Sequence, residues 1–150
     1  MIEAGIRALL LADTGVSALV ADSTRDPPGR GRVFPLMLPQ TPASPLPAIT
    51  YARVSGIRDT TLSGPVGLVK ARLQVDCWAS TFDGARGLAG AVRRALDGYR
   101  GWVSDVNPDD PADVTNHDVQ GCFLLTERDL YEPDPKTFRV VQDYLVVATE

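Results

Sequence analysis

The stretch from Leu68 to Ala79 constrains the fold more than any other part of the chain, because apolar and polar side chains alternate along it. The apolar positions recur at every second residue: Val69, Ala71, Leu73, Val75 and Cys77. The positions between them are polar: Lys70, Arg72, Gln74 and Asp76. A period of two is that of a β-strand, whose successive side chains point to opposite faces. We therefore predict a strand with one face on a core and the other toward water or a partner.

Other segments favour strands by composition and pattern. The longer ones are 48–57, 119–130 and 138–148, and the shorter ones are 33–36 and 102–106. Pro35 removes a backbone donor, which restricts its segment to the edge of a sheet. A Pro-rich turn at 132–136 joins the last two long segments, as in an antiparallel pair.

Two segments have the periodicity of amphipathic helices. Apolar residues at helical spacing predict a helix over 2–12, and Val16 to Val20 form one further turn. A second helix is expected from a cap at Ser80 or Thr81 to about Asp97. Helices beside sequential strands indicate an α+β domain, an antiparallel β-sheet with two α-helices packed on one face.

Three segments are predicted to be long loops. Residues 22–32 are polar and rich in Pro and Gly, residues 58–67 are polar with two glycines, and residues 107–117 are acidic. The 150 residues are enough for one core, so we expect a single domain spanning 1–150.

Composition limits the classes of partner. A formal net charge of −4 argues against nucleic-acid binding that depends on neutralising phosphates. No apolar run approaches the roughly 20 residues that span a bilayer, and the early Glu3 is not typical of a secretion signal. We therefore expect no membrane association.

The acidic segment near residue 107 partly matches a calcium-binding loop. Asp105, Asn107 and Asp109 occupy the first three ligand positions. Asp110 stands where the loop needs Gly, and Asn116 stands where it needs a bidentate Glu. We therefore expect no metal, and the basic run 29–32 matches no phosphate- or dinucleotide-binding fingerprint, so no cofactor is expected either.

Catalysis by a thiol or an imidazole has few candidates. His117 is the only histidine, and Cys77 and Cys122 lie inside apolar strand patterns without a CxxC pair. A reactive thiol needs a polarised, accessible site, which neither cysteine is expected to have. A small α+β enzyme or ligand-binding domain using Cys77 or His117 is nevertheless an alternative interpretation.

Charge is concentrated at the end of the segment 119–130. Glu127, Arg128 and Asp129 follow one another there, and Arg58 and Asp59 form a second charged pair in the polar segment upstream. Exposed ion pairs contribute only about 0–1 kcal/mol each, so these side chains could be ordinary surface. The alternative is pairing between subunits, where partial desolvation strengthens the bonds.

An ordered set of short segments is similar to a known family. The set consists of VSGIRD at 54–59, LSGP at 62–65, ARLQVDCWA at 71–79, ERDLYEP at 127–133 and FRV at 138–140. In order and spacing it resembles the tail-completion (tail terminator) proteins of long-tailed bacteriophages and phage-like particles, over most of the chain. The resemblance implies the α+β fold above and a virion structural protein without catalytic activity or cofactor.

The resemblance also implies an assembly. Tail terminators form a ring, typically a hexamer, that caps the head-proximal end of the tail tube, ends its polymerisation and joins the tail to the head connector. The implied partners are further copies of the chain, the tail tube protein and the connector or stopper protein, while DNA passes through the lumen without specific binding. The implied place is the tail-neck region of the virion, after assembly in the bacterial host cytoplasm. Infectious phage and gene transfer agent both fit, and a head-to-tail joining or stopper neck protein is the alternative. The expected subunit or tube contacts are Arg58, Asp59, Arg72, Glu127, Arg128 and Asp129.

Overall fold

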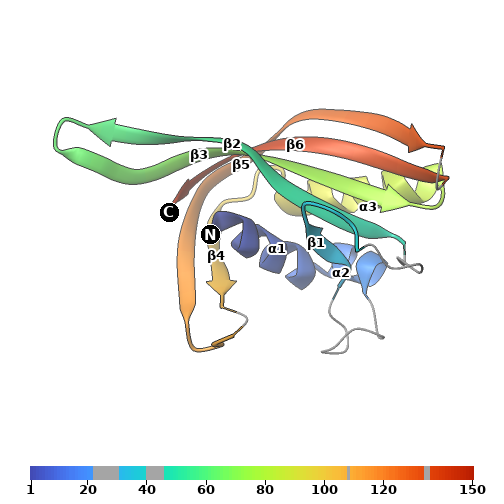
Figure 1. Cartoon of the computed structure of the whole chain (residues 1–150), viewed down its shortest axis with the longest axis horizontal. Helices are drawn as coiled ribbons and strands as arrows, with labels where there is room; N and C mark the ends of the chain where they lie inside the picture. The colour runs from blue at the N-terminus through green and yellow to red at the C-terminus, as the bar shows by residue number, and fades with distance from the viewer. Residues whose placement is uncertain (22–30, 40–45, 108, 134–135) are drawn as a thin grey trace.

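The computed structural model describes residues 1–21, 31–39, 46–107, 109–133 and 136–150. These residues form one six-stranded sheet, in the order β1-β2-β3-β6-β5-β4, and three α-helices (Figure 1). The strands are β1 (Val33–Pro35), β2 (Ala48–Thr61), β3 (Gly64–Ala79), β4 (Gly101–Val106), β5 (Val114–Glu132) and β6 (Thr137–Thr149). The helices are α1 (Ile2–Ala12), α2 (Thr14–Val20) and α3 (Phe82–Leu96).

The predicted alternating strand is confirmed as the centre of the sheet. β3 contains the whole of 68–79 and pairs antiparallel with β2 on one side and β6 on the other. Each of its five alternating apolar side chains is no more than 1% exposed, whereas Lys70 and Arg72 between them are exposed. The period of two therefore encodes one face in the core and one polar face, on which Asp76 alone among the four polar residues is buried, at 7% exposed.

Two of the helices described, α2 and α3, begin where a side chain caps them. Asp13 accepts a hydrogen bond from the backbone N–H of Val16 at the start of α2, and Thr81 accepts one from Gly84 at the start of α3. The helix predicted over 2–12 is confirmed as α1. Gly5 on α1 lies against β4, where an added Cβ would come within 2.6 Å of Val103 Cγ2, so the close approach of helix and strand requires glycine.

The predicted arrangement, an antiparallel sheet with two helices on one face, is wrong. The structure is mostly β, the sheet is mixed because β1 runs parallel to β2, and there are three helices. Residues 16–20, expected to form one further turn, belong to a separate helix, α2, which begins at Thr14. Figure 1 shows the sheet curling around the helices. The prediction failed because strand direction and curl depend on contacts between distant segments, which local periodicity does not contain.

The curl comes from long, bulged strands. β5 pairs with β4 from Val114 to Val119 and with β6 from Val119 to Glu132. Two register shifts, after Val119 and after Leu124, lie at and just beyond the point where it changes partners. A β-bulge bends its strand and increases the local twist. β5 therefore turns a corner, which folds β4 against α1 instead of leaving it in the plane of β6.

The predicted loop at 58–67 is wrong as well. β2 continues to Thr61 and β3 begins at Gly64, so this segment is the end of a β-hairpin, with Thr61 opposite Gly64. Gly64 and Gly67 have φ values of +129° and +77°, a region that only glycine adopts readily. The segment lacks the alternation of a half-buried strand because neither of its faces is buried by the core.

Of the other two predicted loops, the one over 107–117 is shorter than predicted, and the one over 22–32 lies mostly outside the described residues. In the segment predicted as a loop over 107–117, β5 already begins at Val114, opposite Val106, so the connection is shorter than predicted. The segment 22–32 lies outside the described residues except for Gly31 and Arg32. The side chain of Arg32 donates hydrogen bonds to the carbonyl oxygens of Pro47 and Ala21, which attaches this end of the segment to the body. No helix in the described ranges is long and apolar enough to cross a membrane.

Candidate interaction surface

The six charged residues predicted at interfaces lie on three strands, and five of them make ion pairs within the chain. Arg58 pairs with Glu150, Asp59 with Lys70, and Arg72 with Asp143. Glu127 and Asp129 both pair with Arg86 of α3. Arg128 has no ion pair in the described part of the chain. The structure thus distributes the six over both faces of the sheet and does not gather them into one site.

The charged run on β5 is divided by the alternation of the strand. Glu127 and Asp129 point toward α3, where Arg86 Nη1 lies 2.6 Å from Glu127 Oε1 and 3.2 Å from Asp129 Oδ1. Arg128, between them, points to the opposite, outer face and is exposed. Neighbouring charged side chains on this strand therefore lie on opposite faces of the sheet.

Glu127 is held in its ionised form. Burial favours the neutral acid, but hydrogen bonds from the Gln142 amide and the Arg86 guanidinium outweigh it and lower the pKa of Glu127. Gln142 Nε2 lies 2.6 Å from Glu127 Oε2 and 3.0 Å from the carbonyl oxygen of Ala89 on α3. Glu127 therefore helps to attach α3 to the sheet, a structural role that sequence reasoning did not find.

The outer face of the sheet carries polar side chains paired across strands. Arg72 Nη2 of β3 lies 2.6 Å from Asp143 Oδ2 of β6, and Thr126 of β5 donates to the same oxygen at 3.1 Å. Farther along, Arg139 of β6 lies 3.4 Å from Asp76 of β3, and its guanidinium lies 4.8 Å from the centre of the Trp78 ring. These contacts join the three central strands and leave Arg72 45% exposed.

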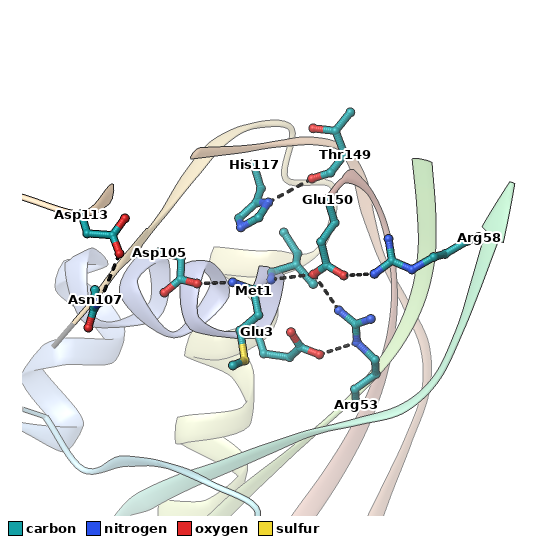
Figure 2. Close-up of polar contacts among 11 residues, drawn as sticks. Met1, Glu3, Arg53, Arg58, Asp105, Asn107, Asp113, His117, Thr149 and Glu150 are labelled. Atoms are coloured by element: carbon teal, nitrogen blue, oxygen red, sulfur yellow. Dashed lines mark hydrogen bonds and ion pairs between the residues drawn. The ribbon is translucent and has the colours of Figure 1, made fainter. Parts of the chain in front are cut away.

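A network of charges lies at the end of β6, where Glu150 is the common acceptor (Figure 2). Its carboxylate accepts hydrogen bonds from the backbone N–H of Ile2 at 2.9 Å, from Arg53 at 2.9 Å and from Arg58 at 2.5 Å. Arg53 also pairs with Glu3 of α1. Burial alone would raise the pKa of Glu150, but these donors lower it to about 2. Glu150 therefore connects the start of α1 to β2.

The hairpin that extends past this network is the feature that the sequence analysis missed. We call residues 54–68 the hairpin arm; in Figure 1 it projects from the body as the joined ends of β2 and β3. Its large apolar side chains are exposed: Val54 (53%), Ile57 (68%), Leu62 (112%) and Val66 (53%). A signal was present, since Leu62 lies in the Leu62-Ser63 turn and the other three lie on the strands beside it, but the polar residues between them obscured it. Apolar side chains concentrated on a projecting element indicate an interaction surface.

The cysteines have no catalytic environment. Both are free and buried, and burial raises the pKa of Cys77 and raises that of Cys122 to about 12. Cys77 lies opposite Val140 near the start of β6, whereas His117 lies beyond the pairing of Val119 with Ala148 near its end. At about 3.3 Å per residue, that separation is roughly 30 Å along the sheet, so the two do not form a Cys–His pair.

His117 itself is a buried structural residue. It is 4% exposed, its Nδ1 lies 3.1 Å from the carbonyl oxygen of Thr149, and its Nε2 has no hydrogen-bond partner among the described residues. The adjacent cavity has a volume of about 240 Å³ and is lined by Val66, Gly67, Thr115, Asn116, His117, Thr149 and Glu150. It is smaller than the roughly 300–1,000 Å³ typical of small-molecule sites.

The acidic segment after β4 forms local turns. Asn107 accepts a hydrogen bond from the backbone N–H of Asp109, and its amide donates to Asp113 (Figure 2). Asp110 accepts from the N–H of Ala112. Within the described ranges no group of three or more potential ligands is placed to hold a metal ion.

Comparisons with known proteins identify a family and a solved structure with a similar fold. The family model for "Tail completion protein gp17" matches residues 4–149. A solved structure titled "Virion of native gene transfer agent (GTA) particle" contains a similar chain, with a TM-score of 0.63 and 15% sequence identity, covering 97% of this chain and 92% of that one. No curated protein matches the chain. The structural likeness shows a shared fold.

Proposed function

Because the chain belongs to the family of the tail completion protein gp17, we propose that it forms a ring of six copies on the head-proximal end of a tail tube. The family is one of virion tail structural proteins, not an enzyme family. In the proposed role the ring ends polymerisation of the tube and joins the tail to the head connector. The match over residues 4–149 is the single observation that carries the proposal.

The surface of the molecule supports this role in two ways. A ring of identical subunits needs two different patches on each subunit that meet head to tail. The hairpin arm, with Leu62 and Ile57 exposed, supplies an apolar patch. The outer face of the sheet around Arg72 supplies a second, polar patch. The likeness to a chain of a gene transfer agent virion is consistent with a place in a phage-like particle.

Within this role we assign the six charged residues to contacts with neighbouring subunits or with the tube: Arg58, Asp59, Arg72, Glu127, Arg128 and Asp129. Arg128 is the strongest member, since it is exposed and makes no ion pair in the described part of its own chain. The other five orient their partners inside the subunit as well. The proposed partners are other copies of the chain, the tail tube protein and the connector or stopper protein, with DNA crossing the lumen unbound.

The test is polymerisation of the tail tube protein from the same particle with and without this chain, observed by negative-stain electron microscopy. Tubes that stop growing and carry a ring at one end would support the proposal. Native mass spectrometry of the chain alone would give the ring size. Tubes of unchanged length with bare ends would contradict termination, and copies bound along the sides of the tube would indicate a different place in the tail.

A further inference from the structure

The outer face of the sheet carries apolar side chains where β5 and β6 pair. Leu124 lies opposite Tyr144, which is buried in the core. The adjacent pair, Phe123 and Leu145, therefore lies on the outer face, and so does Val147, two residues farther along β6. Leu145 and Val147 are half-buried, whereas Phe123 is 50% exposed. We call Phe123, Leu145 and Val147, with the exposed Leu125 next to them, the outer patch.

Two bulges in β5 set the position of Phe123. The register of β5 with β6 skips one residue on either side of it, Gln120 and Leu125, and a bulge re-aims the side chains near it. The Phe123 ring lies over Gly121, where an added Cβ would come within 2.6 Å of the ring atom Cε2. A large aromatic side chain that is held in place and half exposed is typical of the centre of an interface.

The end of the hairpin arm has the matching chemistry. We call residues 60–66 the arm tip; it contains no charged side chain, and its Leu62 and Val66 are 112% and 53% exposed. The arm tip does not reach the outer patch of its own chain. Gly64 lies six residues before Lys70, the β3 residue opposite Val147, and six residues span roughly 20 Å of strand. Figure 1 shows the arm projecting away from the body.

The charges that border the outer patch are already paired within the chain. Arg72, which lies opposite Leu145, pairs with Asp143. Lys70, which lies opposite Val147, pairs with Asp59. An uncharged arm tip therefore covers the patch without burying an unpaired charge, which would be costly.

The aromatic side chains at the far end of β5 fit the arm tip less well. Tyr131 and Phe82 both contact Phe138, with ring centroids 4.9 and 6.2 Å apart, so the chain itself covers part of their surface. Asp83, next to Phe82, is exposed and has no ion pair among the residues described. An uncharged segment packed there would desolvate this carboxylate without pairing it.

We propose that the arm tip packs on the outer patch of the next copy of this chain. This contact rests on the proposed ring and is the one that closes it. Tip and patch are different surfaces, so the contact is heterologous, and one such contact repeated around a ring covers both. The arm spans residues 54–68, about 15 residues, and one side of a stable interface contributes roughly 20–30, so the arm supplies about half of a side or more.

Cross-linking of paired cysteines tests the contact. The double variant Ser63→Cys, Leu125→Cys adds one thiol at the arm tip and one at the outer patch, and it keeps Phe123 and the apolar side chains of the tip. The two native cysteines are buried. A short bismaleimide, applied to the chain at high concentration and to capped tubes, is expected to give a ladder of linked oligomers on a denaturing gel.

The matched control is Ser63→Cys, Phe82→Cys. Phe82 is as exposed as Leu125, at 48%, but lies at the start of α3, away from the outer patch. The control is expected to give no ladder beyond dimer. An equal ladder in the control would overturn the outer patch as the docking site. Cross-links to the tube protein alone would overturn the neighbouring copy as the occupant.

A single substitution gives a second measurement. Phe123→Ala should weaken association of the copies at least about tenfold, measured by native mass spectrometry or by the concentration that caps half of the tubes. Phe82→Ala should change it less than twofold, and circular dichroism checks that both variants fold. No ladder under either condition, or unchanged association of Phe123→Ala, would overturn the docking. Capped tubes without a ladder would leave the proposed function standing with another contact. A ladder with uncapped tubes would overturn the termination role and leave the docking.

Discussion

The body of the sheet and the hairpin arm are parts of the same two strands with opposite surroundings. In the body, β3 lies between β2 and β6, and its side chains Leu73 and Val75 are buried in the core. On its other face, exposed Arg72 pairs with Asp143 of β6. In the arm, Ile57 and Leu62 are exposed and have no core to join. Side chains in the body are therefore constrained by folding, whereas apolar side chains in the arm are free to serve contacts with another molecule. Substitutions should separate stability from assembly along this boundary.

The largest expected effect concerns the core of the body. Leu73→Ala removes a side chain that is 1% exposed and leaves a cavity, so the free energy of unfolding should fall by about 2–5 kcal/mol. The same substitution in the arm, Leu62→Ala, should change it by less than about 0.5 kcal/mol. Urea unfolding followed by circular dichroism measures both. If the two variants lose similar stability, Leu62 contributes to the packing of the folded chain, and the contrast between body and arm is wrong.

The contrast also explains which parts of the fold were predictable. The helix over 2–12 and the strand over 68–79 were found because one face of each is buried, which imposes a period on the sequence. In the arm neither face is buried, so no period exists, and the segment 58–67 looked like a loop. The parallel pairing of β1 with β2 and the curl of the sheet depend on contacts between distant segments. No local pattern records such contacts.

The candidate site shows the same limit at the level of single residues. The opposite directions of Glu127 and Arg128 follow from strand alternation and were predictable. The pairing of Glu127 with Arg86 was not, because it requires α3 to lie beside β5. The role of Glu150 was equally hidden, since its partners Ile2, Arg53 and Arg58 come from three distant parts of the chain.

Glu150 lies at the junction between the two regions, and its titration offers an intermediate effect. Its pKa is about 2 in the folded state against an ordinary value of 4.5. A lowered folded-state pKa contributes stability that is fully present above about pH 4.5 and is lost as the pH falls toward 2. Glu150→Gln should therefore lower the free energy of unfolding at pH 7 by about 1–3 kcal/mol and reduce its pH dependence below pH 4.5.

Thermal unfolding at several pH values between 2 and 7 measures this effect. The matched control is Asp59→Asn, whose ion pair with Lys70 is well exposed, so its loss should change the free energy by less than about 1 kcal/mol. Equal pH profiles for Glu150→Gln and the unmodified chain would show that the network does not connect the arm to the body.

The smallest effect on folding and a large effect on assembly are expected together at Arg128. The residue is exposed on the outer face of β5 and makes no ion pair in the described part of the chain, so Arg128→Glu should change the free energy of unfolding by less than about 0.5 kcal/mol. If Arg128 meets an acidic group on a neighbouring subunit or on the tube, charge reversal replaces attraction by repulsion at the interface. Capped tubes should then become rarer while the melting temperature stays the same.

Arg94→Glu, an exposed charge reversal on α3, is the control and should leave capping intact. Normal capping with a lowered melting temperature would instead assign Arg128 to the body, and the separation between folding and assembly surfaces would then fail on the outer face.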